Sequence, residues 1–116
     1  MAEQSLNRVV VAGGTGLVGR ALVRALVARQ AEIAVITRHP GSAKLPAGVR
    51  ALGWDRLTEA LEGADAIFNL AGEGIADRRW SARRRKAILQ SRVGPTEDLV
   101  EALRACDRRP SVLVNA

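Results

Sequence analysis

The sequence contains no tyrosine, and aromatic side chains make up only 3% of its 116 residues. Proteins that bind single-stranded nucleic acid stack bases on aromatic side chains. So poor a supply of aromatic rings disfavours a base-stacking role for this chain.

Cysteine is almost absent as well, because Cys106 is the single one in the chain. It can form neither an intrachain disulfide nor a multi-cysteine metal site, and we expect it to be a small packing residue on a helix. The longest nearly apolar run is too short to cross a membrane. Residues 1–4 also lack the basic and apolar regions of a signal peptide. The sequence therefore predicts a cytoplasmic protein without a membrane partner.

Acidic residues are outnumbered by basic ones, which gives a formal net charge of +6 and a pI near 11.2. Six of the basic residues lie close together, at Arg78, Arg79, Arg83, Arg84, Arg85 and Lys86. A solvated helical face is the simplest interpretation of this cluster. A nucleic-acid surface is the less favoured alternative, and contacts from some of these arginines to an anionic cofactor or substrate are a third.

Apolar residues follow two different periods along the chain. Short runs rich in β-branched residues predict strands at 8–12, 32–37, 49–52, 66–70 and 111–114. Helical spacing predicts helices at 17–29, 57–61, 81–92 and 96–106, the last two interrupted or kinked at Gly94 and Pro95. We expect Asp55 to cap the short helix and Gly63 to end it with a positive φ.

Strands that alternate with helices predict an α/β fold with a parallel sheet and right-handed crossovers. The expected strand order is 3-2-1-4-5, which is a doubly wound sheet of the Rossmann type. Such sheets bind ligands at the carboxyl ends of their strands, beside the point where the strand order reverses.

A glycine-rich turn joins the first strand to the first helix, with glycines at Gly13, Gly16 and Gly19. Glycine permits a tight turn, a close approach of backbone to pyrophosphate, and close packing of helix on strand. The free N–H groups at the helix start can bind a diphosphate. We therefore favour dinucleotide binding over a plain structural turn, with contacts from Gly13, Thr15, Gly16, Leu17, Val18 and Gly19.

The end of the second strand indicates which dinucleotide is bound. An NAD site places an acid there to bind the ribose 2′-hydroxyl, yet no acid occurs between Glu32 and Asp55. Thr37, Arg38 and His39 stand there instead, and an arginine can pair with a 2′-phosphate. This favours NADP over NAD, although an ordinary exposed arginine is the alternative. We expect His39 to contact the adenosine end.

Asn69 and the three residues after it, Leu70, Ala71 and Gly72, follow the fourth predicted strand. Small residues here let the backbone pass close to a cofactor, but they also suit a plain turn.

Several segments together resemble the extended or atypical branch of the short-chain dehydrogenase/reductase superfamily. The glycine run at 9–19 and the segment 69–73 carry the broad resemblance. The nucleoside-diphosphate-sugar epimerase-like family is indicated by these segments in this order: 36–38, Trp54-Asp55, 69–73, Arg79-Trp80 and Ser91-Arg92. The resemblance implies that the glycines approach the pyrophosphate, and Thr37 and Arg38 the 2′-phosphate. It places Leu70 and Ala71 on the adenosine–ribose side and implies a weaker cofactor contact from Arg92.

This chain departs from the family at the residues that carry chemistry. The resemblance implies a Tyr-x-x-x-Lys segment in catalytic members, a sixth strand and a C-terminal substrate-binding part. The chain has no tyrosine, and its only lysines are Lys44 and Lys86. We therefore expect residues 1–116 to be one NAD(P)-binding Rossmann domain, truncated before the sixth strand, without catalytic residues and inactive in isolation. The resemblance implies an oxidoreductase or epimerase for a longer parent protein.

Two other functions remain open from the sequence. One is a non-catalytic regulatory module that responds to NADP, and the other is nucleic-acid binding through the basic cluster. We also expect self-association, because a sheet that lacks its sixth strand leaves an edge open.

Overall fold

The computed structural model of the chain describes residues 7–13, 16–71 and 82–115, with the backbone alone for 82–93. It forms one parallel sheet of five strands in the order β3-β2-β1-β4-β5. The strands are β1 (Arg8–Ala12), β2 (Glu32–Ile36), β3 (Arg50–Leu52), β4 (Ala66–Asn69) and β5 (Val112–Asn115). The α/β class and the predicted strand order are both confirmed.

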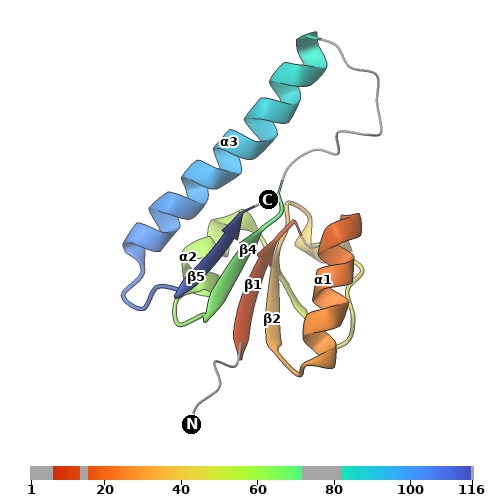
Figure 1. Cartoon of the computed structure of the whole chain (residues 1–116), viewed down its shortest axis with the longest axis vertical. Coiled ribbons are helices and arrows are strands. Elements are labelled where there is room, and N and C mark those ends of the chain that lie inside the picture. Colours follow the sequence, from red (N-terminus) through yellow and green to blue (C-terminus); the bar gives the residue numbers. More distant parts are fainter. Residues whose placement is uncertain (1–6, 14–15, 72–81, 116) are drawn as a thin grey trace.

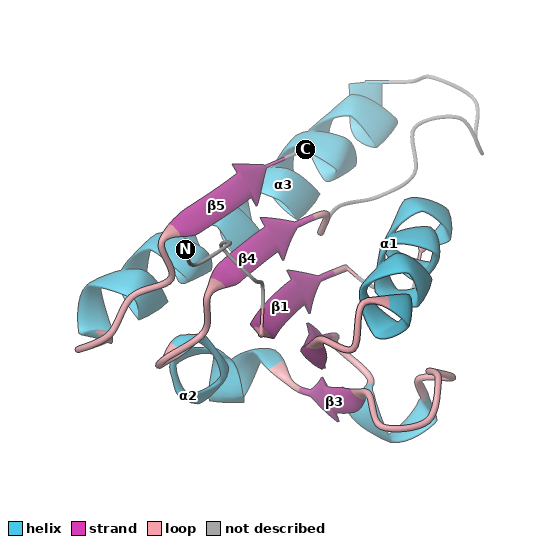
Figure 2. Cartoon of the chain, turned by 60° about the horizontal axis from the view of Figure 1, so that its bottom comes forward, coloured by secondary structure: helices cyan, strands magenta, loops and turns pink. Residues whose placement is uncertain are grey.

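Helices cover both faces of this sheet. Helix α1 (Leu17–Ala28) lies on one face, while α2 (Leu57–Leu61) and α3 (Ala82–Ala105) lie on the other (Figure 1). Figure 2, turned by 60° from that view, shows the same layers, with β1 between α1 and the pair α2 and α3. This arrangement buries both faces of the central strands, so these strands read as continuous apolar runs in the sequence.

Successive side chains of β1 enter two different cores. Val9 and Val11 pack on the α1 side, against residues that include Val23 and Leu26. Val10 and Ala12 pack on the opposite side, in a cluster to which α2 and α3 contribute Leu61, Leu99 and Ala102 among others. The alternation follows from the period of two along a strand. It fixes the register in which β1 pairs with β2 and β4.

The long helix α3 differs from the prediction, because it runs through Pro95 without interruption. A proline inside a helix removes one backbone hydrogen bond and crowds the preceding turn. Here the half of α3 after Pro95 is held by Leu99 and Ala102, both buried in the core. Burial of this apolar face outweighs the local preference of proline to end a helix.

The start of α2 also differs from the prediction. A short 3₁₀ turn, Trp54–Arg56, precedes the helix, and Arg56 occupies the cap position without a side-chain capping bond. Asp55 is therefore not the cap, because it lies inside the 3₁₀ turn. Gly63 does adopt the expected positive φ, at 75°.

Strand β5 lies at one edge of the sheet. Val112, Leu113 and Val114 are 41%, 51% and 40% exposed, although they are apolar. Self-association through this edge stays a prediction. No helix in the described part of the chain is both long and apolar enough to span a membrane.

Candidate functional site

The first strand ends at Gly13, where the backbone passes directly over the turn that follows β4. Gly13 has a φ of 84°, and a Cβ built on it would lie 2.6–2.7 Å from the Leu70 carbonyl and the Ala71 nitrogen. Its N–H donates to the Ile36 carbonyl, and the Leu70 N–H donates to the Ala12 carbonyl. Glycine is required here both for its backbone conformation and for lack of space. The ends of β1, β2 and β4 are thereby held together.

Helix α1 begins directly beyond this contact and has no acidic partner at its start. Gly16 is the cap residue, makes no side-chain capping bond, and is followed by no acid in the first turn. The first residues of the helix are exposed, Leu17 by 81% and Val18 by 67%, whereas Gly19 is buried. The start of a helix carries free N–H groups and a partial positive charge. Both are suited to an anion.

The segment after β2 lies at the same edge of the sheet. The Thr37 N–H donates to the Leu52 carbonyl at 2.9 Å, and the Thr37 hydroxyl accepts from the His39 N–H at 3.3 Å. Arg38 and His39 are both exposed. Within the described residues, Arg38 forms no ion pair. Its guanidinium is therefore free to meet an anion from solution.

Asn69, at the end of β4, is the one buried polar side chain in the described part of the chain, at 4% exposure. Its amide nitrogen donates to the Asn115 side-chain oxygen at 2.7 Å and to the Thr96 hydroxyl at 3.4 Å. Its amide oxygen accepts from the Ala71 N–H at 3.3 Å. Asn69 therefore ties the turn under Gly13 to β5 and α3. This role does not follow from a turn of small residues, although a polar residue that ends an apolar run is a signal for it in the sequence.

The structure brings most of the predicted site residues to a single edge. The glycine turn and the start of α1 lie there with the ends of β2 and β4, as parallel strands with the observed order require. Thr15 and Gly72 lie outside the described residues, as does the side chain of Arg92. The side chains of the basic cluster at 78–86 likewise lie outside the described residues. The roles assigned to all these residues stay predictions.

Cys106 is a packing residue, as expected, but it follows the end of α3 instead of lying on a helix. It lies in the core beside α2, and its Sγ contacts the Thr58 carbonyl at 3.8 Å. Burial raises the pKa of this thiol, and a protonated thiol is neither a good nucleophile nor a metal ligand. Within the described residues, no group of three or more His, Cys, Asp or Glu side chains could hold a metal ion.

Comparison with known proteins identifies the family to which this sequence belongs. A model of the NAD dependent epimerase/dehydratase family matches residues 9–116, which is nearly all of the chain. The chain belongs to this family. Epimerase family protein SDR39U1 of Bos taurus is 40% identical over 110 residues, which cover 92% of this chain and 35% of that protein.

Two solved structures are similar to this chain in fold. The crystal structure of human epimerase family protein SDR39U1 with NADPH matches at a TM-score of 0.77 and 36% identity. That match covers 93% of this chain and 35% of the human one. MoeE5 in complex with UDP-glucose and NAD matches at a TM-score of 0.66 and 28% identity, over 84% of this chain and 33% of MoeE5. The chain thus spans about a third of the length of these proteins.

Proposed function

We propose that this chain is an NADP-binding domain whose cofactor lies across the carboxyl ends of β1, β2 and β4. In this proposal the glycine turn and the first N–H groups of α1 bind the pyrophosphate. Arg38 pairs with the 2′-phosphate, and Leu70 and Ala71 line the adenosine–ribose side. One observation carries the proposal: the end of β2 presents an unpaired Arg38 where an NAD site has an acid.

Two further observations support this choice of cofactor. The human relative was crystallised with NADPH and shares 36% identity. The NAD-bound MoeE5 is less similar, at 28% identity.

The family resemblance also implies a tyrosine as proton donor, and this chain contains none. We therefore propose that these 116 residues bind the cofactor without turning over a substrate, and that the full-length protein is an oxidoreductase or epimerase acting by hydride transfer.

Calorimetric titration with NADPH and with NADH tests the proposed cofactor. We expect the chain to bind NADPH more tightly, and Arg38→Ala to weaken NADPH binding about tenfold or more, because a charge-assisted contact to phosphate is lost. The affinity of the same variant for NADH should change by less than about twofold, because NADH has no 2′-phosphate.

Arg50→Ala is the matched control. Arg50 is also exposed, but it begins β3 level with Ala34, in the middle of β2, and so lies away from the carboxyl edge of the sheet. Its loss should leave both affinities unchanged. Failure of the chain to bind either dinucleotide would contradict the proposed function, as would equal losses for Arg38→Ala and Arg50→Ala.

A further inference from the structure

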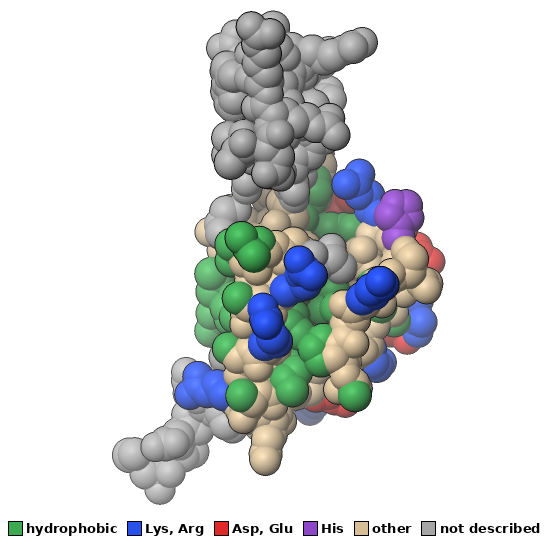
Figure 3. Space-filling view, turned by 90° about the vertical axis from the view of Figure 1, so that its right-hand side faces the viewer, with side chains coloured by type: hydrophobic (Ala, Val, Ile, Leu, Met, Phe, Trp, Pro, Cys, Tyr) green, Lys and Arg blue, Asp and Glu red, His purple; other side chains and the backbone are tan. Residues whose placement is uncertain are grey.

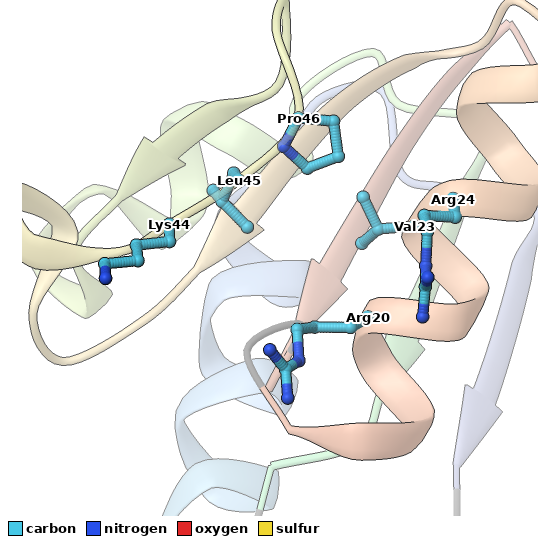
Figure 4. Close-up of a pocket in the computed structure, with 6 residues that line it drawn as sticks. All are labelled: Arg20, Val23, Arg24, Lys44, Leu45 and Pro46. Carbon is cyan, nitrogen blue, oxygen red and sulfur yellow. The ribbon is translucent and has the colours of Figure 1, made fainter.

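Polar side chains around α1 and polar side chains around β5 differ in how firmly they are held. On the α1 side, a groove of about 220 Å³ lies between the helix and residues 44–46. Figure 4 shows Arg20 and Arg24 extending from α1, with Lys44 on the facing segment. Neither ion pair in the described part of the chain involves these three cations. Figure 3 faces this side and shows Lys and Arg side chains among hydrophobic ones. Exposed side chains change rotamer quickly, so a ligand can rearrange this side of the molecule.

Beside β5, three polar side chains bind one another. The Asn69 amide nitrogen donates to the Asn115 side-chain oxygen at 2.7 Å and to the Thr96 hydroxyl at 3.4 Å. The Asn69 amide oxygen accepts from the Ala71 N–H at 3.3 Å. Asn69 is 4% exposed, and a buried amide needs a partner for each polar atom. Its nitrogen and its oxygen both have one, so this amide is held in a single orientation.

The backbone of Ala71 decides which way both amides face. An N–H group can only donate, so the Asn69 atom opposite the Ala71 N–H is the oxygen. The Asn69 nitrogen therefore needs acceptors on its other side, and Asn115 supplies one. The two residues lie level with each other in the pairing of β4 with β5, at the short spacing of neighbouring strands. A residue of β5 thus holds the orientation of an amide that belongs to β4.

The orientation of the Asn69 amide shapes the turn that follows β4. Its oxygen binds the N–H group two residues further on, the contact that defines an Asx turn. The backbone of this turn lies against Gly13, because a Cβ built on Gly13 would come within 2.6–2.7 Å of the Leu70 carbonyl and the Ala71 nitrogen. The glycine turn can keep its place only where the turn after β4 keeps its shape. Asn115 therefore reaches the glycine turn through Asn69.

We propose that Asn115 is a positioning residue for cofactor binding, which acts by orienting the buried Asn69 amide and so the turn after β4. The inference rests on the proposed function and extends it to β5, a strand to which that function assigns no cofactor contact. Without an acceptor at residue 115, the turn leaves its binding conformation in a fraction of the molecules. Affinity falls in proportion to the fraction that remains competent. Thr96 holds the same amide more weakly, because its contact is longer.

Asn115→Leu tests the inference, because leucine is similar in size and has no acceptor. We expect the Kd for NADPH to rise about two- to fivefold in calorimetric titration, since one buried hydrogen bond is lost. Hydrogen exchange of the Ala71 N–H, followed by NMR in the free chain, should become faster relative to that of the β1 amides. Thr96→Val should produce both changes to a smaller extent, and Thr96→Ser, which keeps the hydroxyl, should produce neither.

Asn115→Asp is the conservative variant, because it keeps an acceptor oxygen for the Asn69 amide. Exchange of the Ala71 N–H should stay as slow as in the unsubstituted chain. The added negative charge should weaken NADPH binding by repulsion, and salt screens this repulsion. At high salt, Asn115→Asp should therefore bind NADPH as the unsubstituted chain does under the same conditions, whereas the loss in Asn115→Leu should persist.

Val114→Ala is the control for lost packing in β5. Val114 is 40% exposed and has no polar side-chain atom to join the network. This variant should lower the temperature of unfolding without changing the Kd for NADPH or the relative exchange of the Ala71 N–H.

Two results would overturn the inference and leave the proposed function standing. One is unchanged exchange of the Ala71 N–H in Asn115→Leu while the unsubstituted chain binds NADPH. The other is equal losses of affinity at high salt for Asn115→Leu and Asn115→Asp. Failure of the unsubstituted chain to bind NADPH would contradict both the inference and the proposed function.

Discussion

The two ends of the sheet differ in whether acidic side chains accept hydrogen bonds from backbone N–H groups. At the amino end, acidic side chains accept hydrogen bonds from free backbone N–H groups. The Asp65 carboxylate accepts from the N–H groups of Asn7 and Arg8, at 2.9 and 2.8 Å. The Glu62 carboxylate accepts from the N–H groups of Asp107 and Arg108. These contacts join the start of β1 to the start of β4, and the segment before β4 to the segment before β5.

At the carboxyl end, Asp55 follows β3, but no acidic side chain of the described residues there accepts a hydrogen bond from a backbone N–H group. Helix α1 starts without a side-chain cap, and Arg38 has no ion-pair partner there. Backbone N–H groups that are satisfied internally add stability, whereas those left free can bind a ligand. The amino end of the sheet thus stabilises the fold, whereas the carboxyl end leaves the N–H groups at the start of α1 and the Arg38 side chain open to an anion.

The largest effect should come from closing the space at the carboxyl end. Gly13→Ala forces a Cβ into the turn after β4, where a Cβ at Gly13 would meet the Leu70 carbonyl at 2.6 Å. We expect a loss of about 3 kcal/mol in the free energy of unfolding, from backbone strain and overpacking together. Urea unfolding measures this loss, and NADPH binding should fail in the same variant.

Gly48→Ala is the matched control for backbone strain. Gly48 has nearly the same φ, 85°, but nothing lies within 4 Å of its Cβ position. It should cost only about 1 kcal/mol, the price of the left-handed conformation alone. Equal losses in the free energy of unfolding for the two variants would show that the clash with Leu70 and Ala71 does not destabilise the fold.

A smaller effect is expected at the amino end, from Glu62→Gln. Hydrogen bonds from the Asp107 and Arg108 N–H groups lower the pKa of the Glu62 carboxyl in the folded chain. Unfolding therefore takes up a proton at acidic pH, so the stabilisation is complete above about pH 5 and is lost as the pH falls through the lowered pKa.

The variant should be less stable than the unsubstituted chain at neutral pH, and this difference should shrink toward acidic pH. Because Glu62 is accessible to solvent, the loss should be smaller than that of Gly13→Ala. Urea unfolding of both proteins at a series of pH values measures the difference. A difference that does not vary with pH would exclude the ionised carboxylate as its cause.

The smallest effect on stability should come from placing an acid at the start of α1. Leu17→Glu places a carboxylate in the first turn of α1, at a side chain that is 81% exposed. Interaction with the helix dipole should raise stability by about 0.3–1 kcal/mol, while repulsion of the cofactor phosphates should weaken NADPH binding. Leu17→Gln, which has similar size without charge, should show neither change. Parallel changes in stability and affinity would break the proposed division between the two ends.

Much of this architecture follows from local sequence pattern. Three successive patterns indicate a strand–turn–helix unit: the β-branched run of β1, the glycine turn and the amphipathic α1. They agree because each meets a different local requirement of that unit. The 3-2-1-4-5 order also follows, since right-handed crossovers leave few arrangements.

The prediction failed where tertiary contacts outweighed local preference. Pro95 did not break α3, because burial of Leu99 and Ala102 holds the helix beyond it. Asp55 was expected to cap α2 but lies in a 3₁₀ turn.

The fold class, the glycine turn and the lack of an acid at the end of β2 can be read from the sequence, because they depend on residue type and spacing along the chain. The packing of the sheet and its helices, by contrast, places Gly13 against Leu70 and Ala71 and joins Asn69 of β4 to β5. It alone brought Arg20 and Lys44 to one groove. The physical reason is that each of these contacts joins segments far apart in the chain, whose approach depends on how the sheet and its helices pack.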